Sequence, residues 1–190
     1  MKYTIPCLFG LEALVADELR RLDLKNVRVD RADYLFLHGE NIRIEDYVQN
    51  GNYSFQYCRN VTIRDAEIHS KDAFWNSEDV TVYDSVLDGE YLGWHSKRLK
   101  LVNCRISGTQ PLCYAQDLVM ENCTMDDDCD LAFEYSTLRA DINGCVRSVK
   151  NPRSGSITAG GYGEIIFDAH VKAPADCEIR VGGERNCFSA

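Results

Sequence analysis

The chain has 190 residues, 21 Lys and Arg against 30 Asp and Glu, and a formal net charge of -9 at pH 7. A chain of this length is typical of a single domain. The acidic excess argues against the basic surface that nucleic acids and anionic membranes require, so we expect neither as a partner. Residues 1–7 lack the apolar core of a signal peptide, and no apolar run is long enough to span a membrane. The sequence therefore predicts a cytoplasmic protein.

The cysteines agree with this location. There are nine of them, an odd number, and none forms a C-x-x-C pair. Secreted domains with many disulfides usually carry an export signal and an even number of cysteines. We therefore expect reduced thiols.

One pattern recurs every 19 residues between residues 36 and 125. Its first part is a pair of apolar residues with one residue between them: Ile42/Ile44, Val61/Ile63, Val80/Val82, Leu99/Leu101 and Leu118/Met120. A column of Asp or Asn follows each pair: Asp46, Asp65, Asp84, Asn103 and Asn122. A further inward column precedes each pair: Phe36, Phe55, Phe74, Gly93 and Leu112. Such a fixed period is the signature of a repeat architecture.

Alternation with period two identifies each short segment as a strand with one buried face. The buried positions change parity after the Asp or Asn, for example from Ile44 to Tyr47. Asp and Asn tolerate the left-handed backbone conformation, so we expect a one-residue bend at this column. Each repeat is then one coil, and coils stacked at strand spacing pair every strand with its equivalent. The sequence predicts a right-handed parallel β-helix of about six or seven coils, a pectin-lyase-like solenoid in the all-β class.

Two other solenoids fit less well. Leucine-rich repeats need an L-x-x-L-x-L-x-x-N spacing, which no repeat shows, and left-handed hexapeptide helices need a small residue every six positions. The 19-residue register slips by one at Leu138/Ala140 and fades after Asn151-Pro152. Ile157/Ala159 and residues 165–167 are the candidates for the last, irregular coils.

An open β-helix needs caps at its ends. Residues 10–22 place their apolar side chains at helical spacing, which predicts an amphipathic helix over about 10–22 that caps the first coil. We therefore expect an N-terminal cap segment over 1–31, the β-helix over 32–176 and a C-terminal tail over 177–190. A helix presented to a partner is the alternative role.

The N-terminal segment also carries a resemblance. Residues 3–31 contain the run Pro6-Cys7-Leu8-Phe9-Gly10-Leu11-Glu12-Ala13 followed by the helical pattern. This segment looks like the N-terminal tip of THUMP-containing RNA and DNA adenine methyltransferases. Those enzymes need a glycine-rich cofactor loop and an Asn-Pro-Pro-Tyr-type motif, whereas the Asn151-Pro152 pair continues with Arg-Ser. We therefore expect no methyltransferase activity.

A second resemblance covers most of the chain. Its motifs are Gly51-Asn52-Tyr53-Ser54-Phe55, Ser70-Lys71-Asp72-Ala73-Phe74-Trp75-Asn76, Gly89-Glu90-Tyr91-Leu92-Gly93-Trp94-His95-Ser96, Phe133-Glu134-Tyr135-Ser136 and Ser148-Val149-Lys150-Asn151-Pro152. Over residues 32–170 these motifs resemble the C-terminal part of an uncharacterised bacterial family, domain of unknown function 3737. Its members resemble pectin-lyase-like right-handed β-helices, so the resemblance implies that fold. It implies no established function, and the coils that usually precede this part are replaced here.

Stacking makes residues 19 apart neighbours on adjacent coils. Trp75 and Trp94 share such a column, and strand alternation next to Phe74 predicts that both point outward. Exposed aromatic rings suit stacking on a sugar ring or another planar ligand. The ligand-binding candidates are Trp75, Trp94, Tyr91, Tyr114, Glu134 and Tyr135. The alternative is a surface ladder that a neighbouring loop or a second subunit covers.

Carbohydrate hydrolysis would need two carboxylates, which Asp72, Glu90 and Glu134 could supply. A lyase would need a basic residue, for which Lys97 or Lys150 is available. The catalytic candidates are Asp72, Glu90, His95 and Lys97. Structural ion pairs, Lys71–Glu90 and Glu78–Lys97, explain the same charges, and His95 suits a structural role beside Asn76 and Tyr114.

The remaining polar features point to structure rather than chemistry. Asp126-Asp127-Asp128 reads as a solvated bend, with a weak cation site as the alternative. Cys104 and Cys123 continue an inward column as small apolar residues, and the other cysteines lack zinc spacing. The stretch Gly160-Gly161-Tyr162-Gly163 reads as a loop. We therefore predict no metal site and no cofactor.

Two functions remain open. The first is a non-catalytic solenoid that binds a partner, a glycan or small molecule, or a second copy of itself. The second is a carbohydrate-active enzyme with its site on the face of Trp75 and Trp94. The shortened coil stack favours the first.

Overall fold

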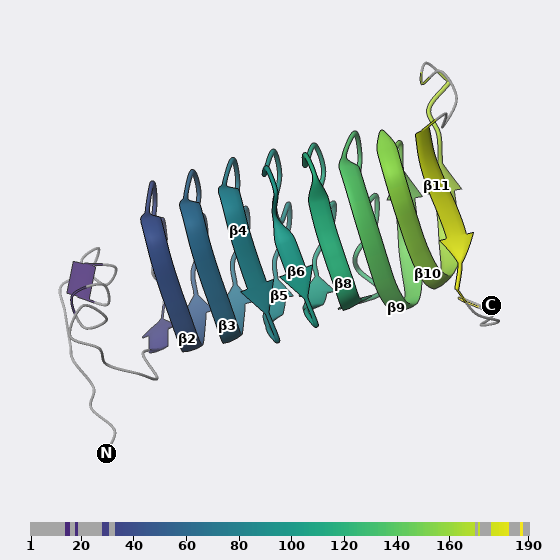
Figure 1. The fold of residues 1–190 in the computed structure, drawn as a ribbon. Helices are drawn as coiled ribbons and strands as arrows, with labels where there is room; N and C mark the ends of the chain where they lie inside the picture. The colour runs from purple at the N-terminus through teal and green to yellow at the C-terminus, as the bar shows by residue number, and fades with distance from the viewer. Residues whose placement is uncertain are drawn as a thin grey trace.

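The computed structural model describes residues 14–15, 18, 28–30, 33–169, 171, 176–182 and 187 (Figure 1). Within these residues the strands form one parallel sheet wound into successive coils, which confirms the predicted parallel β-helix. The strands are β1 (Arg28–Asp30), β2 (Glu40–Asn50), β3 (Arg59–His69), β4 (Glu78–Tyr83), β5 (Val86–Asp88), β6 (Lys100–Val102), β7 (Arg105–Ser107), β8 (Leu118–Met125), β9 (Thr137–Lys150), β10 (Ser154–Ile166) and β11 (Asp176–Val181).

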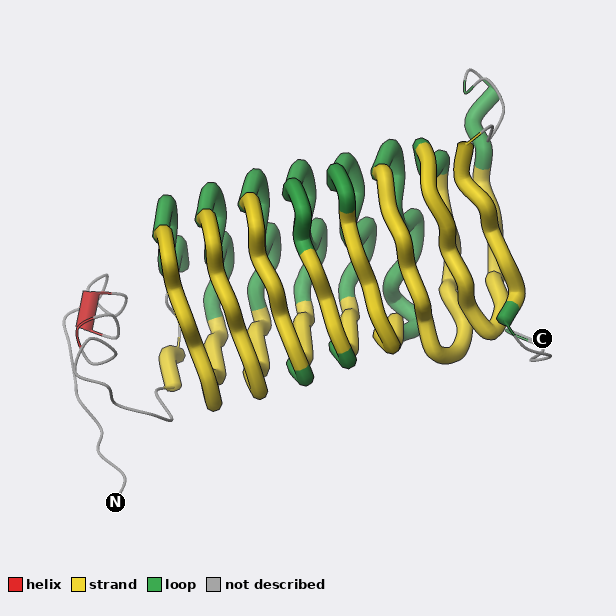
Figure 2. Tube along the Cα trace, in the orientation of Figure 1, coloured by secondary structure: helices red, strands yellow, loops and turns green. Residues whose placement is uncertain are grey.

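The register of the strands is the 19-residue repeat itself. Ile42 of β2 pairs with Val61 of β3, which pairs with Val80 of β4. Strands β2, β3, β4, β6, β8, β9, β10 and β11 follow one another along the stack (Figure 1). Strands β5 and β7 lie off this path, where β5 pairs with β3 and β7, and β7 pairs with β8. Loops join the coils along the edges of the stack (Figure 2). Each residue therefore has its column neighbours directly above and below it.

The Asp and Asn column forms the predicted bends. Asp46, Asp65, Asp84, Asn103 and Asn122 all have left-handed backbone conformations, with φ between 50° and 54°. The amide side chains also connect the coils, because Asn122 Nδ2 donates to Asn103 Oδ1 and Asn103 Nδ2 donates to Asp84 Oδ1, each at 2.8 Å. The column therefore combines a local conformational preference with contacts between coils.

Substitution of Asn103 separates these two contributions. We expect Asn103→Ala to lower the free energy of unfolding by about 1–2 kcal/mol, since it loses both side-chain hydrogen bonds and strains the left-handed backbone. Asn103→Gly keeps the backbone relaxed and should cost less than Asn103→Ala. Urea denaturation of both variants measures the difference. Equal losses in the two variants would show that the left-handed conformation adds nothing at this position.

A feature that the repeat does not reveal lies in the loops between the strands of successive coils. These are the segments 33–38, 52–57, 71–76, 90–95, 109–114 and 130–135, which we call the corner loops. Every second residue in them has positive φ, as in Tyr53, Phe55 and Tyr57. In the four loops between residues 52 and 114, each of these residues donates its backbone N–H to a carbonyl of an adjacent coil. These hydrogen bonds offset the cost of the left-handed conformation.

The core fills the inside of the coils. Phe55 and Phe74 are fully buried, and their rings stack at 5.3 Å between centroids, while Phe36 stacks on Phe55 at 4.9 Å. Cys104 and Cys123 are buried in their inward column, as expected. Buried columns of this kind hold neighbouring coils together through apolar contact.

The ends of the stack differ in part from the sequence expectations. The register slip is confirmed, because Leu118 pairs with Leu138 and Met120 with Ala140. β11 pairs with β10, so the sheet extends past residue 176, where the sequence predicted its end. The predicted helix over 10–22 falls largely outside the described residues, among which Leu14, Val15 and Glu18 are helical.

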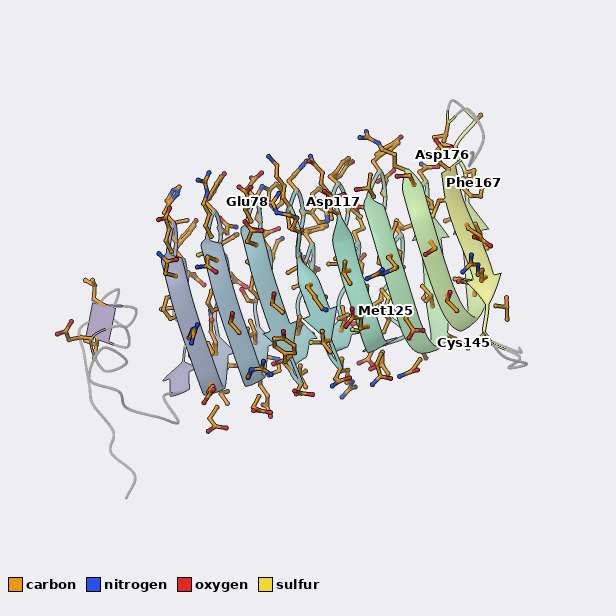
Figure 3. The ribbon with its side chains drawn as sticks, viewed as in Figure 1. Glu78, Asp117, Met125, Cys145, Phe167 and Asp176 are labelled. Carbon is orange, nitrogen blue, oxygen red and sulfur yellow. A yellow bond between two sulfur atoms is a disulfide. The ribbon has the colours of Figure 1, made fainter. Side chains whose placement is uncertain are left out.

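The expectation that all cysteines are reduced is wrong for two of them. Cys145 and Cys187 form a disulfide, with their Cα atoms 5.7 Å apart. Cys145 lies in β9, at the edge of the stack opposite Glu78 and Asp117 (Figure 3). Sequence spacing could not reveal this pair because its members are 42 residues apart. The other cysteines of the described residues are free and buried.

Candidate functional site

Six side chains gather on the outside of the corner loops, and we call them the aromatic corner: Trp75, Tyr91, Trp94, His95, Tyr114 and Tyr135. The rings of Trp75 and Trp94 lie 5.3 Å apart, and Trp94 meets Tyr91 and Tyr114 edge-on at 5.0 and 5.2 Å. His95 is exposed, and the five Trp and Tyr side chains of the aromatic corner are partly buried. The predicted aromatic ligand candidates are therefore brought together on one surface.

Trp75 and Trp94 are oriented by a different cause from the strand alternation that the sequence suggested. Trp75 and Trp94 lie in corner loops, not in strands, so strand alternation does not direct them. Trp94 is held in place by its own indole, whose Nε1 donates to the carbonyl of Gln110 at 2.6 Å. His95 stacks on Tyr114 at 4.8 Å, as the shared column predicts. The rings are thus fixed by the coils before any ligand arrives.

The first acidic candidates flank Tyr91. Glu90 is exposed and forms the predicted ion pair with Lys71, at 3.3 Å. The ammonium of Lys71 also lies 5.1 Å from the centre of the Tyr91 ring. Asp72 is 8% exposed, and burial raises the pKa of its carboxyl, an effect that Lys71 opposes and Glu90 reinforces. One paired and one buried carboxylate therefore adjoin the aromatic corner.

The second predicted ion pair is replaced by others. Glu78 pairs with Arg98 and with Arg59 rather than with Lys97. The hydrogen bond from Arg98 lowers the pKa of Glu78, and the charge of Lys97 acts in the same direction. Arg98 also binds Asp79. The guanidinium of arginine offers several donors to neighbouring carboxylates, which a lysine cannot match. Lys97 itself is exposed.

Glu134 and Lys150 form a separate ionic cluster at the other end of the aromatic corner. The ammonium of Lys150 lies 2.9 Å from Glu134 and 3.6 Å from Asp168. The hydrogen bond from Lys150 to Glu134 raises the pKa of the ammonium. A protonated, doubly paired lysine is a poor base. The geometry therefore explains Glu134 and Lys150 as structural partners.

The acidic run Asp126-Asp127-Asp128 forms the solvated bend that the sequence predicts. Asp127 and Asp128 are exposed in a turn, and Asp126 pairs with Arg105 at 2.7 Å. Within the described residues, no group of three metal-binding side chains lies together. The bend is thus a solvated turn with one ion pair.

The pH dependence of the Tm tests the buried environment of Asp72. We expect Asp72→Asn to raise the Tm near pH 7, because the ionised carboxyl is unfavourable in its buried position. The gain should shrink as the pH falls through the raised pKa of Asp72, and vanish below the ordinary pKa of aspartate, where both states are protonated. Thermal denaturation of the native protein and the variant between pH 3 and 7 measures this.

Asp88→Asn is the matched control with the opposite sign. Hydrogen bonds from Ser107 and His69 lower the pKa of Asp88, so the ionised form stabilises the fold. This variant should lower the Tm near pH 7, and the loss should disappear as the pH falls through the lowered pKa. A Tm change of the same sign in both variants would contradict the assigned environments.

A cavity of about 540 Å³ lies elsewhere, near the last coils. It is lined by Thr124, Asp141, Ile142, Asn143, Gly144, Thr158, Ala159, Gly160 and Gly182. None of these residues belongs to the aromatic corner. No signal in the sequence pointed to this cavity, because it depends on the irregular pairing of β9 with β10 at Ala159/Gly161.

Sequence reasoning also missed aromatic residues on the same columns. Tyr34 stacks on Tyr53 at 4.8 Å, and His38 stacks on Tyr57 at 5.0 Å. These residues lie at the 19-residue spacing from the predicted candidates, so extension of the columns towards the N-terminus would have found them.

In the part of the chain that the structure describes, no helix is long and apolar enough to cross a membrane. Neither the curated proteins nor the solved structures contain a significant match to this chain. Nothing found bears on the resemblance of residues 3–31 to the methyltransferases. One protein family matches residues 14–180, and its description is "Protein of unknown function (DUF3737)". The match contains residues 32–170, where the motifs predicted it, and it begins earlier, at residue 14, inside the segment that resembled the methyltransferases. It covers most of the chain, and the chain therefore belongs to this family.

Proposed function

We propose that this protein is a non-catalytic binding solenoid that uses the aromatic corner to hold a ring-bearing ligand. The observation that carries the proposal is the contact between Trp75, Trp94 and the neighbouring Tyr91, His95 and Tyr114 on one partly exposed surface. Aromatic rings supply large contact areas at a small cost in conformational entropy. A surface already ordered by the coils pays little to bind.

The charged residues support a binding role over a catalytic one. Glu90 is paired with Lys71, and Glu134 is paired with Lys150. A general base or nucleophile has to be available to the substrate, and these side chains are engaged with each other. The ion pairs therefore suit a rigid surface better than a reaction centre.

A glycan and small-molecule binding screen tests the proposal. A ligand of the native protein should bind Trp94→Ala at least about tenfold more weakly, since the variant loses the central ring of the aromatic corner. Tyr83→Ala is the matched control, because Tyr83 lies in β4, outside the corner loops, under the guanidinium of Arg64. Ligands that bind both variants equally well, or the absence of any ligand, would refute the proposal.

A second copy of the chain is the competing occupant of this surface. If the aromatic corner mediates self-association, sedimentation of the native protein should show an oligomer that Trp94→Ala dissociates. A monomer in both cases leaves the surface available to a ligand.

A carbohydrate-active enzyme is the second candidate function, and one observation favours it. Asp72, with its raised pKa, lies within electrostatic reach of Glu90. Glycosidases use two neighbouring carboxyl groups as acid and as base or nucleophile. In this case Asp72→Asn should abolish the release of reducing sugar from a bound glycan. Binding without turnover in the native protein would eliminate this function.

We also propose a cytoplasmic location. The free thiols of the described cysteines fit a reducing compartment, whereas the Cys145–Cys187 disulfide fits an oxidising one. Cell fractionation decides between them, and recovery of the protein outside the cytoplasm would overturn the proposal.

A further inference from the structure

A second group of rings lies on the columns of the aromatic corner, nearer the N-terminus, and the proposed function does not use it. We call Tyr34, His38, Tyr53 and Tyr57 the N-terminal rings. Tyr34 and Tyr53 share the column of Tyr91, while His38 and Tyr57 share that of His95 and Tyr114. Their stacks are nearly parallel, at 20° and 21° between planes. Tyr34 is 55% exposed and Tyr57 is 45% exposed. Each ring stacks on its column neighbour, so the outer ring edge with its hydroxyl group meets solvent.

The two groups lie on the same two columns of the corner loops, in successive coils. Tyr57 donates its backbone N–H to the carbonyl of Trp75, which joins the loop of the N-terminal rings directly to the aromatic corner. Coils repeat at the strand spacing of about 4.8 Å, and the loops of Tyr34 and Tyr135 are five coils apart. The two loops are therefore separated by about 24 Å along the solenoid axis. A ligand that contacts both groups must therefore be elongated and lie along the solenoid axis.

The charges along these columns indicate an uncharged ligand. The N-terminal rings are three tyrosines and one histidine, and Glu90 and Glu134 beside the aromatic corner are paired with Lys71 and Lys150. A strongly charged polymer would find no matching field on such a surface. Asn76 is exposed between the two groups, and its amide can both donate and accept hydrogen bonds.

The backbone of the corner loops indicates a ligand other than a peptide. An extended peptide binds by adding its N–H and C=O groups to an open strand edge. In the loops between residues 52 and 114, the N–H groups of the positive-φ residues are already bonded between coils. The contacts that remain are those of the ring edges and the tyrosine hydroxyls, and they suit sugar units, which carry C–H groups and hydroxyls that can donate and accept hydrogen bonds.

We propose that the N-terminal rings and the aromatic corner form one strip that binds an uncharged linear polysaccharide along the solenoid axis. This inference rests on the proposed function, because it extends the same surface and names its ligand class. A chain of six sugar units reaches both groups, whereas a chain of three occupies the aromatic corner alone.

Calorimetric titration with uncharged linear oligosaccharides of three and six units, built from glucose, mannose or xylose, tests this. The six-unit chain should bind about tenfold more tightly than the three-unit chain. The double variant Tyr34→Ala/Tyr53→Ala should lose this advantage and leave the affinity for the three-unit chain unchanged. Trp94→Ala should weaken both, and Tyr83→Ala neither. Circular dichroism checks that each variant keeps its β-structure.

The outcomes separate the two proposals. Equal affinity for both lengths, or a double variant that keeps the advantage of the longer chain, overturns the extended strip and leaves the proposed function standing. Binding only of other ring-bearing molecules in the screen likewise overturns the polysaccharide proposal alone. A native protein that binds no ligand of any kind overturns both.

Discussion

Gly108→Ala is expected to lower the free energy of unfolding by about 3 kcal/mol or more. Gly108 has φ +105°, and a Cβ atom built there would lie 2.4 Å from the carbonyl oxygen of Gly89 in the preceding coil. The clash is with backbone, which no side-chain rotation can relieve. The coils would have to separate at this point, in addition to the strain of a left-handed alanine. Urea denaturation measures the loss.

Gly144→Ala is the control for backbone strain alone. Gly144 has φ +90°, but a Cβ atom built there meets nothing within 4 Å. We expect this variant to lose only about 1 kcal/mol. The difference between the two variants measures the close approach of the coils. Equal losses would show that the coils are not packed as tightly as described.

Phe55→Ala is expected to cost about 3–5 kcal/mol, the usual range for a fully buried phenylalanine. Phe55 stacks between Phe36 and Phe74, so its removal leaves a cavity that touches three coils. In a solenoid each coil contacts only its neighbours, and the damage cannot be shared with the rest of the molecule. Thermal and chemical denaturation should both show a large loss.

Tyr57→Ala controls for the backbone conformation, because Tyr57 and Phe55 lie in the same loop and both have φ of 56°. Tyr57 is exposed and loses only its contact with His38, so we expect a cost below about 1.5 kcal/mol. A comparable loss from both substitutions would contradict the inward placement of the phenylalanine column.

The strands and bends were predictable because each depends on one residue and its column. Apolar pairs such as Ile42/Ile44 face the interior, and Asp46 bends the chain, as the 19-residue period indicated. The corner loops were not predictable, because aromatic residues such as Tyr53 and Phe55 have no intrinsic preference for positive φ. Hydrogen bonds between coils impose that conformation, and they exist only once the coils are stacked.

In the candidate site, the 19-residue period predicted which residues are neighbours along the stack, but it did not predict every ion pair. The columns placed Trp75, Trp94 and Tyr114 together, and they predicted the Lys71–Glu90 pair. Partners that depend on the reach of a long side chain were missed, as in the choice of Arg98 over Lys97 by Glu78. A period reveals which residues are neighbours along the stack, whereas ion pairs and the Cys145–Cys187 disulfide depend on side-chain geometry.

The intrinsic fluorescence of the chain tests the central claim most directly. Trp75 and Trp94 are its two tryptophans, and both lie in the aromatic corner. A ligand identified by calorimetry should therefore change the tryptophan emission in a saturable way, with the same Kd. The Tyr83→Ala variant should reproduce the native titration, and Trp94→Ala should require at least about ten times more ligand. A ligand that binds by calorimetry but leaves the tryptophan emission unchanged would contradict the assignment of the binding surface to the aromatic corner.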